Sequence, residues 1–130
     1  MSDATIQQLL DLTQELLDAI ASRNWDVYQR LCDPTLSAFE PEARGHLVEG
    51  IEFHRFYFDL ETSEAPVQTT IAAPHVRLLG EDVAVVSYTR LIQTIAESGK
   101  PATLCFEETR VWQRQQQEWR HVHFHRSTGS

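Results

Sequence analysis

Histidine and arginine side chains near the C-terminal end of the chain are the first that could do chemistry. The stretch HVHFHRS (121–127) places His121, His123 and His125 at alternate positions. Alternate residues lie on one face of a strand, about 7 Å apart, and two such histidines can chelate one metal ion. A zinc site takes three or four ligands, and the sequence offers no Cys-x-x-Cys pair or second histidine pair nearby. We therefore predict no metal at this motif.

Arginine is the more informative side chain, because only Lys100 among the 11 basic residues is a lysine. When positions of the predicted strands are counted in twos, Arg90, Arg110 and Arg126 each end or interrupt an apolar run. If these strand faces coincide, the three guanidinium groups converge in one cavity. Guanidinium groups pair with carboxylates through two parallel hydrogen bonds, so a small carboxylate is the ligand class that such a cavity favours.

Two explanations of these inward arginines remain open from the pattern alone. Burying unpaired cations is costly, so the arginines either bind an anion or are neutralised internally. Glu108 counts onto the same face and is the natural internal partner of Arg110 or Arg126. The same count places the three histidines of the HVHFHRS motif on the opposite, outer face, which suits packing against another subunit. A β-bulge would break the count.

The strands that carry these residues form a meander. A two-residue period runs through 67–80, 82–96, 103–115 and 118–127, and the connections are short enough for hairpins, so neighbours are expected to pair antiparallel. Pro74 lies inside the first of these strands. Because a proline lacks the backbone donor that a central strand needs, it predicts a bulge or a sheet edge there.

Helices are predicted before the meander. Apolar residues recur at helical spacing over 4–23, Asn24 is a candidate N-cap for a short helix over 25–32, and 51–60 reads as a third, aromatic-rich helix. Short extended runs at 36–42 and 46–50 complete the pattern. The fold class is α+β: three N-terminal helices packed on a strongly curved, mostly antiparallel sheet of about six strands. By analogy this is the nuclear-transport-factor-2-like (NTF2-like) cone, with a cavity between the sheet and the third helix.

Length, charge and cysteine content narrow the class of protein. The chain of 130 residues suits one domain, 1–130. A net charge of −8 and a pI of about 5.1 argue against a nucleic-acid partner. The sequence has no apolar run of membrane length and no signal-peptide layout, so no membrane partner is expected. Cys32 and Cys105 lie far apart and are predicted to be free thiols in the cytoplasm.

Two long stretches of the chain closely resemble the association (hub) domain of calcium/calmodulin-dependent protein kinase II. They are CDPTLSAFEPEARGHLVEGIEFHRFYF (32–58) and EETRVW…WRHVHFHRS (107–127), and the resemblance runs from the first helix to Ser127. It implies a cone-shaped domain that forms homodimers and stacked rings of dimers. It also implies an arginine-lined pocket for a small carboxylate, in which the ligand-binding residues fall on His54, Arg90, Arg110 and Arg126.

The chain also differs from that family. It holds no kinase domain and no calmodulin-binding segment, so neither kinase activity nor calmodulin binding is expected from it, and no cofactor is predicted. His121 occupies a position that is usually apolar. We expect a free-standing, bacterial-type homologue.

A small enzyme is the alternative hypothesis, because isomerases, dehydratases and polyketide cyclases share the fold. Such enzymes use an acid or base in an apolar cavity. His54 is the candidate base and Tyr88 or Glu108 the candidate acid, with the arginines holding a substrate carboxylate or enolate. Three neighbouring cations favour the neutral, proton-accepting form of His54. Fold analogy alone does not decide between this activity and the oligomerisation module.

Overall fold

The computed structural model describes residues 2–60 and 66–127. The helices are α1 (Ser2–Ser22), α2 (Trp25–Leu31) and α3 (Glu52–Phe58), with a short 3-10 turn, η1 (Pro41–Ala43). The strands are β1 (Cys32–Phe39), β2 (Val48–Glu49), β3 (Val67–Leu78), β4 (Val83–Ile95), β5 (Pro101–Gln115) and β6 (Glu118–Arg126). The α+β fold class is confirmed, and the element bounds differ from the predicted ones by a few residues at most.

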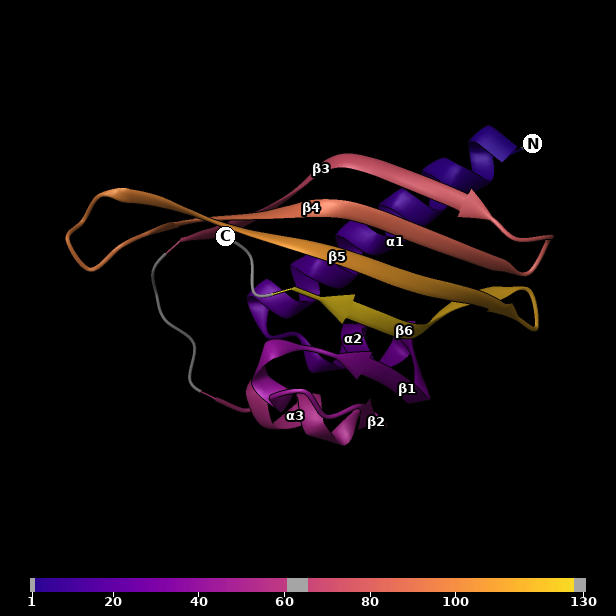
Figure 1. Cartoon of the computed structure of the whole chain (residues 1–130), viewed down its shortest axis with the longest axis horizontal. Helices are drawn as coiled ribbons and strands as arrows, with labels where there is room; N and C mark the ends of the chain where they lie inside the picture. Colours follow the sequence, from indigo (N-terminus) through magenta and orange to yellow (C-terminus); the bar gives the residue numbers. More distant parts are fainter. Residues whose placement is uncertain (1, 61–65, 128–130) are drawn as a thin grey trace.

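The six strands form one mixed sheet in the order β2-β1-β6-β5-β4-β3 (Figure 1). Consecutive strands from β3 to β6 pair antiparallel, as their short connections predict. Strand β1 pairs antiparallel with β2 and parallel with β6. The β1–β6 pair therefore joins the N-terminal half of the chain to the end of the meander.

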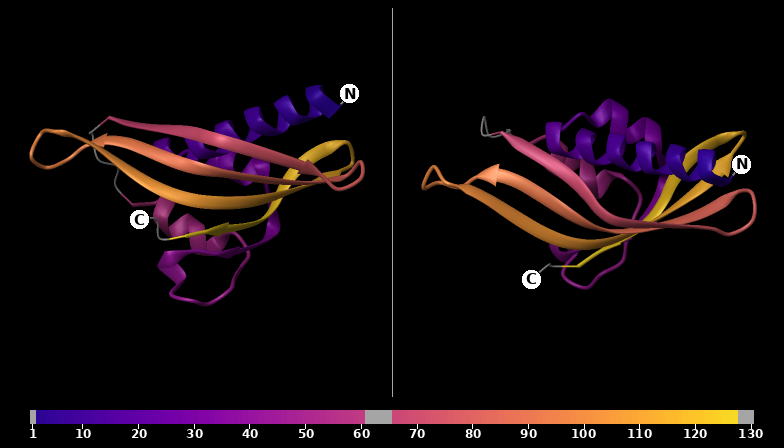
Figure 2. Two further views of the ribbon diagram at one scale, coloured as in Figure 1. Left: turned by 45° about the horizontal axis from the view of Figure 1, so that its top comes forward. Right: turned by 90° about the horizontal axis from the view of Figure 1, so that it is seen from above.

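The helices lie on one side of the curved sheet, and the opposite face carries no helix among the described residues (Figure 2). Helix α1 buries one stripe, which includes Leu9, Leu16 and Leu17, while its acidic residues face outward as predicted. The buried Thr13 hydroxyl donates to the carbonyl of Leu9 at 2.8 Å, which satisfies it inside the apolar stripe. This stripe packs on the inner face of the sheet, which contributes Ala84, Val86, Trp112 and Phe124 to the core.

Local signals in the sequence are confirmed at two places. The Asn24 side chain accepts from the backbone N–H of Val27 at 3.3 Å and so caps α2. At Pro74 the pairing of β3 with β4 shifts register between Ala72 and His75, and β3 is an edge strand of the sheet. In the described part of the chain, no helix is long and apolar enough to cross a membrane.

The last strand differs from the prediction. Val111 on β5 pairs with His123 of β6, but its neighbour Trp112 pairs with His121, so the register shifts by one residue and Val122 is left as a bulge. Because one extra residue reverses the alternation, the side chains before Val122 lie on the face opposite to the one the count gives. His121 is therefore on the inner face and fully buried, and the prediction that all three histidines face outward is wrong for it.

Candidate functional site

A buried carboxylate, Glu108 on β5, is the centre of a hydrogen-bonded cluster on the inner face of the sheet. It accepts from the Tyr88 hydroxyl at 2.5 Å and from Arg90 Nη1 at 2.9 Å, both on β4. Arg110, two residues further along β5, donates from Nη2 to this carboxylate at 3.0 Å and from Nε to the Tyr88 hydroxyl at 2.8 Å. The predicted pairing of Glu108 with Arg110 is confirmed. Its second arginine is Arg90, and not Arg126.

The ionisation of this cluster follows from burial and from the guanidinium groups. Burial raises the pKa of Glu108, but the positive charges of Arg110 and Arg90 outweigh it and lower that pKa to about 2. Burial raises the pKa of Tyr88 despite the nearby Arg110. At neutral pH Glu108 is an anion that accepts three partners, and Tyr88 keeps the proton that it donates.

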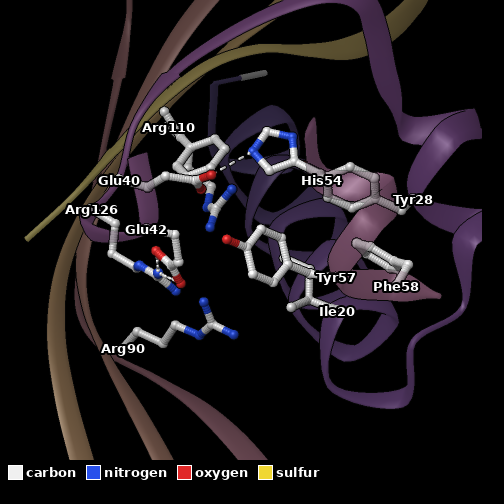
Figure 3. Close-up of a pocket in the computed structure, with 11 residues that line it drawn as sticks. Ile20, Tyr28, Glu40, Glu42, His54, Tyr57, Phe58, Arg90, Arg110 and Arg126 are labelled. Atoms are coloured by element: carbon white, nitrogen blue, oxygen red, sulfur yellow. Dashed lines mark hydrogen bonds and ion pairs between the residues drawn. The ribbon is translucent and has the colours of Figure 1, made fainter. Parts of the chain in front are cut away.

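Beside this cluster lies a cavity of about 90 Å³, which has room for several water molecules or one small carboxylate. Its ionisable lining residues, the tyrosines apart, are Glu40, Glu42, His54, Arg90, Arg110 and Arg126 (Figure 3). Its apolar and aromatic lining residues are Ile20, Tyr28, Tyr57, Phe58 and Phe124. The Tyr57 hydroxyl points toward the arginine groups (Figure 3). The structure thus brings together His54, Arg90, Arg110 and Arg126, the four candidate ligand-binding residues named from the sequence.

Arg126, at the end of β6, is held by a carboxylate from another part of the chain. Its Nη2 donates to both oxygens of Glu42, which lies in the η1 turn between β1 and β2. Its guanidinium also lies over the ring of Phe106, with the carbon 5.2 Å from the ring centroid. On the opposite wall, His54 Nε2 of α3 lies 3.1 Å from a carboxylate oxygen of Glu40. Each outer corner of the cavity therefore carries a cation or histidine beside a glutamate.

Two buried donor atoms of arginines that line the cavity have no hydrogen-bond partner within residues 2–60 and 66–127. They are Nε of Arg90 and Nε of Arg126. The ring nitrogen Nδ1 of His54 has no partner there either. Arg110 differs, because Nε and Nη2 bind Tyr88 and Glu108 and its Nη1 lies 3.4 Å from His121 Nε2. Buried polar atoms are normally paired, so unpaired donors around a cavity are the expected signature of a site for an acceptor ligand.

The buried His121 side chain contacts the Arg110 guanidinium. An arginine has only donors, so His121 Nε2 must be the acceptor of this contact and the proton sits on Nδ1, 3.5 Å from the Cys32 sulfur. Burial and the charge of Arg110 hold the pKa of His121 well below its ordinary value. Burial also raises the pKa of the Cys32 thiol to about 12. The neutral imidazole fixes the far side of the Arg110 guanidinium without adding charge.

The structure separates the residues of the enzymatic alternative. His54 lines the cavity, whereas Tyr88 and Glu108 lie behind the arginines and are outside its lining. Glu108 is ionised, and the Tyr88 hydroxyl donates its proton in the hydrogen bond to Glu108, so neither has a proton to give a substrate at neutral pH.

The other two histidines of the HVHFHRS motif, His123 and His125, are on the outer face, where the count placed them. Among the described residues no group of three or more potential ligands is placed to hold a metal ion.

Sequence reasoning missed Glu40, Glu42 and Tyr57. The two glutamates stand in the FEPEA segment, which the extended pattern treated as the end of a strand. A charge count could have pointed to them, because three inward-facing arginines need more carboxylate than Glu108 supplies. Tyr57 follows His54 by three residues and so shares its face of α3.

Comparison with known proteins gives a family match and close structural neighbours. The family model for the calcium/calmodulin dependent protein kinase II association domain matches residues 5–130. The calcium/calmodulin-dependent protein kinase type II subunit delta of rabbit (Oryctolagus cuniculus) is 50% identical over 123 residues, which cover 93% of this chain and 23% of that protein. The chain spans about a quarter of the length of the curated relatives that it matches.

Two solved structures share both fold and sequence with the chain. The Chlamydomonas reinhardtii kinase II hub homology domain has a TM-score of 0.90 at 48% identity and covers 95% of this chain and 97% of its own. The Caenorhabditis elegans kinase II association domain has a TM-score of 0.92 at 47% identity, with 97% of each chain covered.

More distant structures show the fold alone. A Salmonella enterica protein of the nuclear transport factor 2 (NTF2-like) superfamily has a TM-score of 0.80 at 18% identity and covers 100% of this chain and 94% of its own. A Xanthomonas campestris structure described as a kinase II association domain is only 19% identical, with a TM-score of 0.69 and coverage of 95% and 84%. The NTF2-like fold is confirmed. The expectation of a bacterial-type homologue is wrong, because the relatives near 50% identity are eukaryotic.

Proposed function

The chain belongs to the family of calcium/calmodulin-dependent protein kinase II association (hub) domains, an oligomerisation module, and we propose that it assembles with itself and binds a small carboxylate. The assembly is a homodimer, with a stacked ring of dimers as the larger form. The observation that supports carboxylate binding is the pair of unpartnered Nε donors of Arg90 and Arg126, two residues that line one cavity. Kinase activity and calmodulin binding belong to the longer relatives and are not proposed for this chain.

The outer face of the sheet is the surface proposed for self-association. Its central rows consist of β-branched and hydroxyl side chains, such as Val85 opposite Val111 and Ser87 opposite Thr109, which are only half-exposed. The Ser87 and Thr109 hydroxyls lie 3.3 Å apart and so satisfy one another within the face. A sheet face whose centre is uncharged, and over which the described residues place no helix, suits packing against a second copy.

Substituting Val111→Asp is expected to convert the assembly into smaller species. A carboxylate in the centre of the face must lose its hydration when two copies pack, which costs several kcal/mol. Multi-angle light scattering on a gel-filtration column measures the mass, and circular dichroism checks that the variant is folded. Gln8→Asp on the exposed side of α1 is the control and should keep the wild-type mass. A monomeric wild-type protein would contradict self-association, and a full-sized Val111→Asp assembly would contradict this face.

The carboxylate proposal predicts that Arg126→Gln weakens binding of propionate at least tenfold. A hydrogen bond to a charged group contributes roughly 1.5–3 kcal/mol, which is about a ten- to hundredfold change in affinity. Isothermal titration calorimetry measures it. Arg120→Gln is the matched control, because Arg120 is on the same strand but binds Glu118, away from the cavity. Equal affinity in the Arg126→Gln and Arg120→Gln proteins would count against this site.

A cytoplasmic location is proposed as well, and the state of the cysteines supports it. Both Cys32, which is buried, and Cys105, which is half-buried, are free thiols. The enzymatic alternative lacks comparable support, since His54 is its one candidate group that lines the cavity.

A further inference from the structure

We propose that Glu42 is a built-in competitor of the ligand: its carboxylate holds Arg126 when no ligand is bound, and a ligand carboxylate must displace it. This inference rests on the proposed carboxylate site and adds a regulating residue to it. Arg126 Nη2 donates to both Glu42 oxygens (Figure 3). The Glu42 side chain therefore already offers the Arg126 guanidinium a carboxylate, which is the group that the ligand would offer.

The two carboxylates that pair with the cavity arginines differ in how firmly they are held. Glu108 is fully buried, stands in a regular stretch of paired β-strand and has three donors. The Glu42 side chain is 37% exposed, and within the described residues Arg126 is the one side chain that donates a hydrogen bond to it. When Glu42 swings outward it regains water, whereas Glu108 would leave two buried cations behind. A ligand carboxylate therefore displaces Glu42 rather than Glu108.

The charge of the cavity defines the class of ligand. Three arginines lie in or beside it, matched by the three carboxylates Glu40, Glu42 and Glu108. Burial raises the pKa of Glu42, but the hydrogen bonds and charge of Arg126 outweigh this and lower it, so that Glu42 is ionised at neutral pH. Once Glu42 has left, one positive charge remains uncompensated. The site is therefore matched to a monoanion rather than to a dianion.

The turn that carries Glu42 can open locally. Its own backbone hydrogen bonds hold it together: Ala43 N–H donates to the carbonyl of Glu40, Arg44 N–H to Pro41, and His46 N–H to Ala43, at 3.1–3.2 Å. These are local bonds of an exposed turn, and such segments open at low free energy. Loss of the Glu42–Arg126 pair removes a tie between this turn and β6, so ligand binding should loosen the turn.

The first test compares Glu42→Gln with the wild type in titrations with propionate, a small monoanion. Because glutamine keeps the volume but does not compete as an anion, the affinity for propionate should rise about tenfold or more. Glu49→Gln, an exposed substitution on the neighbouring β2, is the control and should bind as the wild type does. Malonate, a dianion of similar size, should bind the wild-type protein more weakly than propionate. Equal affinities of wild type and Glu42→Gln, or preference of the wild type for malonate, would overturn the proposal.

The second test needs no variant. Hydrogen exchange of wild-type protein with and without saturating propionate should show faster exchange at the amides of Ala43, Arg44 and His46. Slower or unchanged exchange there would overturn the displacement. The results distinguish the role of Glu42 from the existence of the carboxylate site. If the wild type binds propionate through Arg126 but Glu42→Gln changes nothing, only the competitor is wrong. If neither protein binds propionate, the carboxylate site itself is wrong.

Discussion

Glu108→Gln is expected to lower the free energy of unfolding by about 3–5 kcal/mol, the largest effect of any single substitution considered. Removal of one member of a buried ionic cluster leaves the others charged and uncompensated, and that range is typical of such cases. Here Arg90 and Arg110 would keep their charges with side chains 4% and 1% exposed. The Tyr88 hydroxyl would also lose its ionised acceptor. Glutamine fills the same space, so the loss measures charge rather than packing.

Urea unfolding followed by circular dichroism measures this loss, at one protein concentration because assembly adds to apparent stability. Glu107→Gln is the matched control. It changes the adjacent residue in the same way, but Glu107 is exposed on the outer face, and the change should stay within about 0.5 kcal/mol. If both variants unfold at the same urea concentration, the buried cluster does not stabilise the fold as the contacts imply.

Acidification should destabilise the protein from about pH 6.5 downward, with His121 as a principal cause. Burial and Arg110 depress the pKa of His121 in the folded state, whereas the unfolded chain has the ordinary value of 6.5. Below that pH the unfolded state binds a proton that the folded state does not, so stability falls by up to about 1.4 kcal/mol per pH unit. Glu108 adds to the loss below pH 4.5, because its folded pKa of about 2 keeps it ionised while the unfolded carboxyl takes up a proton.

The variant that isolates His121 is His121→Gln, which cannot become charged. Its free energy of unfolding should change less between pH 6.5 and 5 than that of the wild type. His125→Gln removes an exposed histidine from the outer face of the same strand and should keep the wild-type slope. Parallel slopes in the His121→Gln and wild-type proteins would show that another group causes the acid sensitivity. His123, whose pKa is also lowered by partial burial, is the first such group to examine.

The success of the sequence prediction depended on how regular each strand pair is. Arg90 and Arg110 were placed correctly because β4 and β5 pair without a register shift from Val83 to Ile95. Counting in twos then holds over the whole strand. The count failed at His121, because the bulge at Val122 is set by how β6 meets two neighbours at once. Nothing in the residues HVHFHR marks that position, and a bulge is a property of the pairing rather than of the strand alone.

The role of Glu42 was beyond the sequence for a different reason. Its partner Arg126 is 84 positions away, and the two meet only because β1 runs parallel to β6 and ends beside it. Local periodicity reports the face on which a residue lies but not which distant strand becomes its neighbour. Glu108 was found because its partners are on the same hairpin. The sequence thus predicted the arginines, His54 and Glu108, and missed Glu40 and Glu42, the carboxylates that pair with His54 and Arg126.

The parallel pairing of β1 with β6 also determines the order in which the molecule can fold. Strands β3 to β6 are joined by short turns, so their hairpins and the Glu108 cluster can form quickly from local contacts. Cys32 meets His121 across 89 positions, and closing so long a loop carries an entropic cost that slows the step. Refolding kinetics should therefore show tryptophan burial on the meander ahead of the β1–β6 contact. The cavity, whose two walls are these two parts, is then the last feature of the fold to form.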